Sequence, residues 1–213
     1  MSYCKICFEE IKDNSLYNFT HVHSQICEKC FSKFHAKFIK FNIGTIKGLS
    51  IYEYDTNIQN LLFKFKGCYD IELADIFFER YLPYLKLKFR GFYVVPIPSY
   101  YLDDEKRGFN HVVEIYNRLK LPMLKVLEKT SATKQASKSK RKRMDTSDYF
   151  AIHDGDSLTN KKILIVDDVY TTGSSVKAAI SLIKKYNPKE IRVLTIAKNI
   201  EKLSYKKQIN ESG

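Results

Sequence analysis

The sequence reads Ile163-Leu164-Ile165-Val166-Asp167-Asp168-Val169-Tyr170-Thr171-Thr172-Gly173-Ser174-Ser175 across its most informative stretch. Four consecutive aliphatic residues predict a strand that is buried on both faces. Two aspartates end this strand, and a polar turn rich in backbone N–H groups then opens an amphipathic helix. Ligands of open α/β sheets bind beyond the carboxyl ends of the strands, where a helix N-terminus suits a phosphate. Because carboxylates suit ribose hydroxyls or a phosphate-bound Mg²⁺, the stretch predicts a pocket for a phosphorylated sugar.

This stretch resembles, along its whole length, the 5-phosphoribosyl-1-pyrophosphate (PRPP) signature of the type I phosphoribosyltransferases. The resemblance implies that Asp167 and Asp168, the acid pair, hydrogen-bond the ribose hydroxyls. It also implies that residues 171–175, the phosphate turn, hold the 5-phosphate. The PRPP-binding residues that it implies here are Asp167, Asp168, Val169, Tyr170, Thr171, Thr172, Gly173, Ser174 and Ser175. The simpler alternative is an ordinary strand–helix junction with a capping hydroxyl and a solvated acid pair.

Length and composition indicate one packed domain with a small appendage. The chain has 213 residues, of which 44% are hydrophobic and 14% aromatic. No apolar run is long enough to span a membrane, and the N-terminus lacks the apolar core of a signal peptide, so a cytoplasmic location is expected. The net charge of +12 favours a polyanionic partner, with nucleic acid first and an anionic membrane surface second. The alternative is that part of the lysine content reflects an AT-rich genome.

Four of the five cysteines form two pairs near the N-terminus, Cys4-x-x-Cys7 and Cys27-x-x-Cys30, with nineteen residues between the pairs. This spacing is typical of paired zinc knuckles, in which two tight turns supply four thiolates to a tetrahedral Zn²⁺. The zinc is expected to be structural, although the sequence does not distinguish it from iron. Disulfides would need an oxidising compartment, and a thioredoxin-like pair would need a surrounding βαβ pattern. Three histidines are alternative ligands: His21, His23 and His35.

Aromatic residues follow the cysteines at helical spacing, and this spacing favours a core role over a stacking platform for nucleic acid. These residues are Phe31, Phe34 and Phe38. The lysines that would suit nucleic-acid binding by this module are Lys5, Lys12, Lys29, Lys33, Lys37 and Lys40. The remaining cysteine, Cys68, is expected to be a small buried hydrophobe.

The rest of the chain alternates predicted strands and helices. Strands are expected at residues 48–54, 92–95, 123–127 and 191–197, and helices at 57–66, 71–85, 108–120 and 174–186. Pro83 is expected to distort the second of these helices near its end. Such alternation predicts an α/β fold with a mainly parallel sheet covered by helices.

Residues 130–146, the basic segment, are polar and rich in lysine and arginine. A loop of this length inside a compact domain is usually functional or disordered. It is therefore a candidate lid over pyrophosphate or a candidate arm for nucleic acid, with a solvated connection as the alternative. Its candidate DNA-binding residues are Lys134, Lys138, Lys140, Arg141, Lys142 and Arg143.

Nearly the whole chain resembles the ComF family, the competence proteins of bacterial DNA uptake. The matching elements, in order, are the cysteine pairs, Tyr54 with residues 61–67, residues 95–98, residues 107–110, Thr130 with Gln135, Ser139 and Arg143, and the PRPP signature. The resemblance implies a zinc module at residues 1–45, followed by a type I phosphoribosyltransferase-like domain at residues 46–213. It implies that residues 96–99, the proline turn, form the pyrophosphate loop with Ser99, and that Arg107 lies close by. Lys138, where the family usually has Leu, and Asp145 or Thr146, where it usually has Asn, are departures.

The resemblance implies a cytoplasmic protein that handles incoming single-stranded DNA and contacts a helicase-like motor of the uptake machinery. If the chain is an enzyme, Mg²⁺-bound PRPP loses pyrophosphate from C1 as a nucleophile attacks, with Asp167, Asp168 and Arg107 as the catalytic candidates. No histidine or glutamate in a recognisable motif is predicted as the base. Three functions therefore stay open. They are a PRPP-binding, DNA-handling protein, a genuine phosphoribosyltransferase with an unidentified acceptor, and a PRPP-sensing regulator without turnover.

Overall fold

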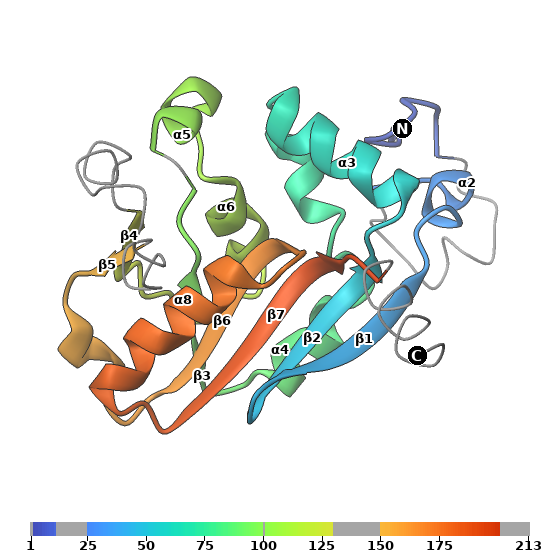
Figure 1. The fold of residues 1–213 in the computed structure, drawn as a ribbon. Coiled ribbons are helices and arrows are strands. Elements are labelled where there is room, and N and C mark those ends of the chain that lie inside the picture. The colour runs from blue at the N-terminus through green and yellow to red at the C-terminus, as the bar shows by residue number, and fades with distance from the viewer. Residues whose placement is uncertain (1, 12–24, 100, 130–149, 201–213) are drawn as a thin grey trace, which may run out of the picture.

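The computed structural model describes residues 2–11, 25–99, 101–129 and 150–200, and its centre is a five-stranded sheet (Figure 1). The strands lie in the order β1 (Ala36–Ile43), β2 (Ile46–Glu53), β7 (Glu190–Lys198), β6 (Lys162–Tyr170) and β3 (Phe92–Pro96). Neighbouring strands from β2 to β3 are parallel, whereas β1 pairs antiparallel with β2 at one edge. The expected mainly parallel sheet is therefore confirmed.

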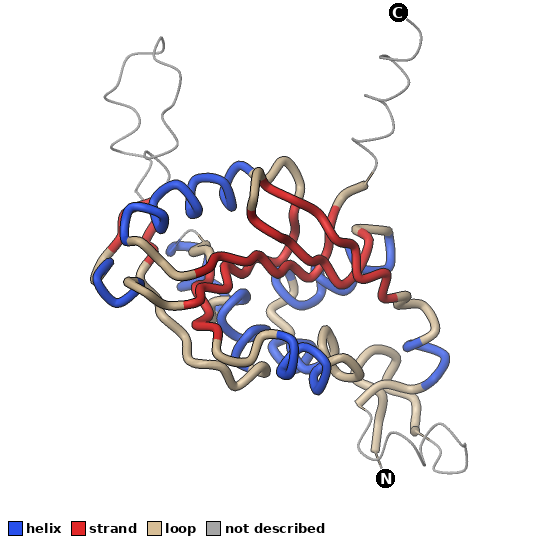
Figure 2. The backbone as a smooth tube through the Cα atoms, turned by 90° about the horizontal axis from the view of Figure 1, so that it is seen from below, coloured by secondary structure: helices blue, strands red, loops and turns tan. Residues whose placement is uncertain are grey.

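Helices cover both faces of this sheet (Figure 2). The described helices and 3₁₀ helices are α2 (Glu28–Phe31), α3 (Thr56–Gly67), η1 (Ile71–Asp75), α4 (Leu82–Lys88), α5 (Tyr101–Arg107), α6 (His111–Asn117), η3 (Gly155–Leu158), α8 (Ser174–Ile183) and η4 (Lys184–Tyr186). Successive residues of β6 enter different cores. Ile163 and Ile165 pack with α8, whereas Leu164 and Val166 pack with α3 and α6. All four are 0% exposed, which explains the continuous aliphatic run in the sequence.

Two of the expected elements were wrong. The predicted helix at residues 71–85 is instead the 3₁₀ helix η1, a series of turns and the separate helix α4. Pro83 lies in the first turn of α4, where its missing N–H breaks no helical hydrogen bond. The predicted strand at 123–127 is reduced to one bridge between Met123 and Val94, and β4 (Leu127–Lys129) begins only at the end of that range.

The elements that were not expected from the sequence include α5, β5 (Phe150–Ile152), which pairs with β4, and the edge strand β1. β1 lies within residues 1–45 and yet belongs to the central sheet. The proposed boundary of the metal module at residue 45 stays a prediction. Among the described residues, no helix is both long enough and apolar enough to cross a membrane.

Candidate functional site

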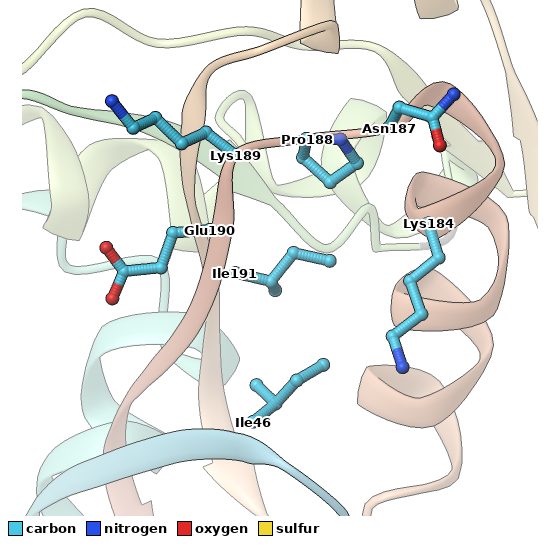
Figure 3. A pocket seen from close by; sticks show the side chains of 7 residues that line it. All are labelled: Ile46, Lys184, Asn187, Pro188, Lys189, Glu190 and Ile191. Atoms are coloured by element: carbon cyan, nitrogen blue, oxygen red, sulfur yellow. The ribbon is translucent and has the colours of Figure 1, made fainter.

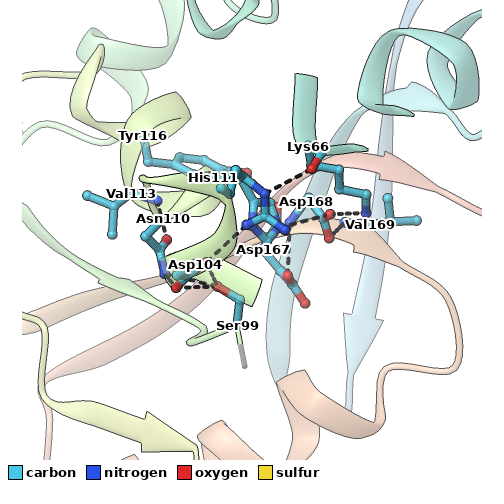
Figure 4. Close-up of polar contacts among 11 residues, drawn as sticks. Lys66, Ser99, Asp104, Asn110, His111, Val113, Tyr116, Asp167, Asp168 and Val169 are labelled. Atoms are coloured by element: carbon cyan, nitrogen blue, oxygen red, sulfur yellow. Dashed lines mark hydrogen bonds and ion pairs between the residues drawn. The ribbon is translucent and has the colours of Figure 1, made fainter. Parts of the chain in front are cut away.

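The acid pair lies at the carboxyl end of β6, on the same edge of the sheet as the proline turn that follows β3. Helices α3 and α6 flank this edge and direct side chains toward the pair (Figure 4). The backbone beneath the pair is fixed by Tyr116 of α6, which is 1% exposed. Its hydroxyl lies 2.9 Å from the carbonyl oxygen of Asp167 and 3.0 Å from that of Leu194. The two carboxylates are therefore presented by a well-anchored strand end.

Asp168 is held by three groups of the protein. Its Oδ2 accepts a hydrogen bond from Lys66 Nζ at 2.7 Å and lies 3.2 Å from His111 Nε2, and its Oδ1 accepts the backbone N–H of Val169 at 2.6 Å (Figure 4). Burial alone would raise the pKa of this carboxyl, but the hydrogen bond from His111 and the charge of Lys66 hold the pKa well below its usual range. Asp168 is therefore the ionised member of the pair.

Asp167 differs from Asp168 in its partners. Its Oδ1 accepts the backbone N–H of Asp168 at 2.9 Å, and no described lysine, arginine or histidine forms an ion pair with it. Burial, followed by the neighbouring Asp168 charge, raises the pKa of Asp167 well above its usual range. The two acids that look equivalent in the sequence are thus chemically distinct in the structure.

Arg107 is buried within this site, with a side chain only 9% exposed. Its Nε donates to the backbone carbonyl of Lys66 at 2.9 Å, and its Nη1 donates to Asp104 Oδ1 at 3.0 Å. The same Nη1 lies 3.1 Å from His111 Nδ1. The guanidinium therefore joins the end of α3, α5 and the start of α6 through its Nε and Nη1 donors.

Ser99 lies in the proline turn and is tied to the same network. Its hydroxyl lies 2.6 and 2.7 Å from the two carboxylate oxygens of Asp104, and Asn110 Nδ2 donates to Ser99 Oγ at 3.0 Å. Asn110 also caps α6, because its Oδ1 accepts the backbone N–H of Val113 at 2.9 Å. The proline turn and the acid pair are therefore linked through side chains of α5 and α6.

The phosphate turn leads from β6 into the ten-residue helix α8. Gly173 is the N-cap of that helix and has a φ of 72°, which favours glycine. Thr172 Oγ1 and Ser174 Oγ lie 2.9 Å apart, and both side chains are exposed. The turn therefore offers two hydroxyls and a helix N-terminus to solvent beside the acid pair.

Replacing Gly173 with alanine is expected to destabilise this turn. A Cβ there would lie 2.4 Å from the Tyr170 hydroxyl, and the Tyr170 ring is packed 4.5 Å from the Phe41 ring, centroid to centroid. The left-handed backbone alone costs about 1–2 kcal/mol, and Tm changes by about 2–4 °C for each kcal/mol in a protein of this size. Gly44→Ala is the matched control in a calorimetric scan, because Gly44 has a φ of 58° but nothing within 4 Å of the added Cβ. Equal losses of Tm in the two variants would contradict the close approach.

The four paired cysteines come together, with all four Sγ atoms within 4.8 Å of one another. Cys7 Sγ and Cys27 Sγ are 3.7 Å apart, and two ligands of a tetrahedral zinc would be separated by about 3.8 Å. Burial opposes ionisation of Cys4, but backbone N–H groups lower its pKa to about 7, whereas burial raises the pKa of Cys30. The donor set and its spacing fit a metal ion, and metal binding would deprotonate the buried thiol.

The four-cysteine cluster is packed firmly on the main domain. Lys5 Nζ forms ion pairs with Glu72 at 2.8 Å and with Asp75 at 3.3 Å, both in η1. The backbone N–H of Gln25 donates to Glu79 Oε1 at 2.8 Å. Cys4 and Cys30 also belong to the apolar cluster that contains residues of α3 and α6. The described part of the N-terminal region is therefore a continuation of the main core.

Lys66 and His111 are the site residues that sequence reasoning missed as functional groups. A signal for His111 existed, because Asn110 is a good N-cap and places the next residue in the first turn of a helix. The expectation for Cys68 was wrong, since it lies exposed at the end of α3. The candidate DNA-binding residues lie outside the described residues: Lys134, Lys138, Lys140, Arg141, Lys142 and Arg143.

A shallow hollow lies at the amino ends of β2 and β7, at the opposite end of the strands from the acid pair (Figure 3). Its lining residues are Ile46, Lys184, Asn187, Pro188, Lys189, Glu190 and Ile191. Since β6 and β7 are parallel, this hollow is remote from the acid pair. It contains none of the residues expected to bind a sugar phosphate.

Comparisons with known proteins place these features in context. The phosphoribosyl transferase domain model matches residues 105–211. The competence protein ComFC of Streptococcus pneumoniae (strain ATCC BAA-255 / R6) is 26% identical over 196 residues, which are 92% of this chain and 86% of that protein. Human hypoxanthine-guanine phosphoribosyltransferase is 40% identical over 40 residues, 19% of this chain and 18% of that protein. A crystal structure of a hypoxanthine phosphoribosyltransferase from Staphylococcus aureus covers 60% of this chain and 64% of its own, with 16% identity and a TM-score of 0.38.

Proposed function

Because the chain belongs to the phosphoribosyl transferase domain family, as a ComF-type member, we propose that it binds PRPP at the carboxyl end of β6. One observation carries this proposal: only residues 169–172 separate the acid pair from the glycine-capped N-terminus of α8, and the turn between them carries exposed hydroxyls. Carboxylates accept hydrogen bonds from ribose hydroxyls, and the turn suits a phosphate. The two halves of the site therefore match the two ends of a ribose 5-phosphate.

The remaining parts of PRPP would lie toward the proline turn. The pyrophosphate carries its own Mg²⁺ and would approach residues 96–99, with Ser99 as the residue implied by the family resemblance. The Nε and Nη1 donors of Arg107 bind Lys66, Asp104 and His111, so through these two nitrogens Arg107 would support the residues around the site. In a transfer reaction the bond from C1 to the pyrophosphate oxygen breaks and a bond to the acceptor forms. The Mg²⁺ would stabilise the charge on the leaving pyrophosphate.

Calorimetric titration with PRPP and Mg²⁺ tests this proposal. The intact protein is expected to bind. Asp168→Asn is expected to weaken binding at least about tenfold, because a hydrogen bond to a charged group contributes about 1.5–3 kcal/mol. Asp167→Asn is expected to weaken binding by less, because Asp167 is not the ionised acid of the pair. Asp156→Asn is the matched control, since Asp156 is exposed on η3 and makes the same change of charge. If the intact protein does not bind PRPP, or if both variants bind as tightly as Asp156→Asn, the proposed site is wrong.

A role in handling single-stranded DNA is the second candidate function. The net charge of +12 and the similarity to a competence protein favour it. Binding of DNA by the basic segment and contact with a helicase-like partner remain predictions for this role. Fluorescence anisotropy of labelled single-stranded DNA, measured with and without PRPP at several salt concentrations, tests this role. Displacement of the DNA by PRPP would indicate a shared site, and unchanged DNA binding would indicate a separate one.

Turnover is a further question for the same site. Release of pyrophosphate from PRPP by the intact protein, with water as the acceptor, would support a transferase. Binding without release would support a PRPP-sensing regulator. Neither outcome changes the assignment of the sugar-phosphate site.

For the four-cysteine cluster we propose one structural zinc ion. Four sulfur donors at tetrahedral spacing suit Zn²⁺, and the cluster leaves no open ligand position for catalysis. Elemental analysis of the purified protein is expected to find about one zinc per chain. A stoichiometric amount of iron in its place would correct the identity of the metal.

A further inference from the structure

The hydrogen bonds around His111 define which ring nitrogen carries its proton. Arginine has donors only, so the contact between Arg107 Nη1 and His111 Nδ1 at 3.1 Å requires an unprotonated Nδ1. The proton must then reside on Nε2, which faces Asp168 Oδ2 at 3.2 Å. His111 thus accepts from Arg107 at Nδ1 on one side and presents its Nε2–H to Asp168 on the other.

The imidazole in this arrangement is buried, and its neighbours are themselves held by hydrogen bonds. His111 is 8% exposed, and its helix start is capped by Asn110. Arg107 is in turn held by Asp104, which is bound by Ser99 of the proline turn. A continuous chain of contacts therefore runs from the proline turn to the acid pair through Asp104, Arg107 and His111.

We propose that His111 is a positioning residue, held in the Nε2–H tautomer by Arg107, which orients the Asp168 carboxylate for binding sugar hydroxyls. This inference rests on the proposed PRPP site and adds the groups that prepare it. Lys66 supplies charge to the same oxygen from the flexible end of a long side chain, which is 36% exposed. The buried imidazole is better suited to orient the Asp168 carboxylate, because both of its ring nitrogens have fixed partners.

The chain of contacts from the proline turn to the acid pair also gives Asp104 an indirect role in the site. Since Asp104 holds Arg107 in place, Asp104→Asn is expected to loosen the orientation of His111, although Asp104 has no direct contact with Asp168 among the described residues. The proline turn and the acid pair would then act as one unit, so that a change at α5 alters binding of the sugar.

The decisive experiment compares His111→Phe with His111→Gln by titration with PRPP and Mg²⁺. Phenylalanine fills the space without hydrogen bonds, and its expected effect is about a 10- to 100-fold loss of affinity. Glutamine can accept from Arg107 and donate to Asp168, so rescue to within about threefold of the intact protein is expected. His153→Phe is the matched control, because the His153 side chain is exposed and pairs with Glu128 on the surface.

Nitrogen NMR of the histidine ring gives an independent readout that does not need a ligand. The intact protein is expected to show His111 with an unprotonated Nδ1 and a protonated Nε2, and Arg107→Met should admit the other tautomer. Equal PRPP affinity of His111→Phe and the intact protein, or a proton on Nδ1, would overturn the inference. If the intact protein does not bind PRPP at all, the proposed function fails, while the tautomer is still decided by the spectrum.

Discussion

Replacing Cys30 with serine is expected to abolish binding of the proposed zinc ion and to lower the thermal stability of the whole protein. Cys30 is 3% exposed, and its sulfur is one of four within 4.8 Å. Structural zinc contributes roughly 10–16 kcal/mol of binding free energy in zinc-finger peptides. Since each kcal/mol shifts Tm by about 2–4 °C in a protein of this size, a fall of at least about 10 °C is expected. A calorimetric scan with parallel metal analysis measures both effects.

The loss is expected to spread because the cysteine cluster and the main domain share one core. Cys4, Ile26 and Cys30 pack in the same apolar cluster as Phe77 and Leu164. The ion pairs of Lys5 add a polar connection to η1, although such partly exposed pairs contribute little by themselves. Loss of the metal would therefore expose apolar surface on the main domain rather than release an independent module.

Cys68→Ser is the control for this experiment. Cys68 is exposed, lies at the end of α3 and is not a member of the four-cysteine cluster. It should retain the metal content and the Tm of the intact protein. A Cys30→Ser protein that keeps a full equivalent of metal, or that keeps its Tm after losing the metal, would show that the cluster does not stabilise the fold.

Local sequence patterns were sufficient to predict those features that are encoded within short stretches of the chain. The aliphatic run before Asp167 predicted β6, and the spacing of the cysteine pairs predicted the cluster that the structure forms. Each of these signals lies within a few consecutive residues or repeats a known ligand spacing. The fold class and the clustering of the four paired cysteines could therefore be predicted.

The partners of Asp168 could not be predicted in the same way. Lys66 is 102 positions away from Asp168 in the sequence, and only the packing of α3 against the sheet brings the two together. No periodicity marks such a pair. His111 carried the weaker signal of a helix start, but nothing in the sequence shows that this helix faces β6.

Tertiary contacts also explain the wrong helix at residues 71–85. Its buried residues Leu73, Ala74, Phe77 and Phe78 have helical spacing. However, the Phe77 carbonyl accepts the Tyr52 hydroxyl at 3.1 Å, and the side chain two residues later accepts the backbone N–H of Gln25. These contacts with β2 and the N-terminal region hold the segment in turns, so tertiary structure overrides its local helical preference.

The two aspartates of the acid pair are expected to affect stability in opposite directions when each is replaced by asparagine. Asp168→Asn removes the charge that Lys66 and His111 bind in a side chain 13% exposed. Because Lys66 is 36% exposed and water screens its charge, the expected loss at neutral pH is about 1–3 kcal/mol. Asp167→Asn instead removes a carboxyl whose ionisation burial and Asp168 oppose, so the folded protein should become more stable at neutral pH.

The pH dependence of stability follows from the same two shifts. Folding lowers the pKa of Asp168, so its contribution to stability is fully present above the unfolded pKa of about 3.9. This contribution is lost as pH falls below 3.9 toward the lower folded pKa. The pKa of Asp167 is raised by folding, so its contribution is present below about 3.9 and is lost as pH rises toward the folded value. In denaturant unfolding from pH 2 to pH 8, Asp168→Asn should remove a rise of stability with pH below about pH 4, and Asp167→Asn should remove a fall of stability with pH above it.

The outcome also separates stability from binding at this site. Asp167→Asn is expected to be more stable than the intact protein at neutral pH and yet to bind PRPP more weakly, as functional sites often retain groups that cost stability. Asp168→Asn should lose both stability and binding. Asp156→Asn, with the same change in an exposed side chain, should follow the intact protein at every pH. If Asp167→Asn and Asp168→Asn shift the unfolding free energy in the same direction at neutral pH, the chemical distinction between the two acids is wrong. The hypothesis that Lys66 and His111 prepare Asp168 alone would then be rejected, and the two carboxylates would have to be treated as equivalent.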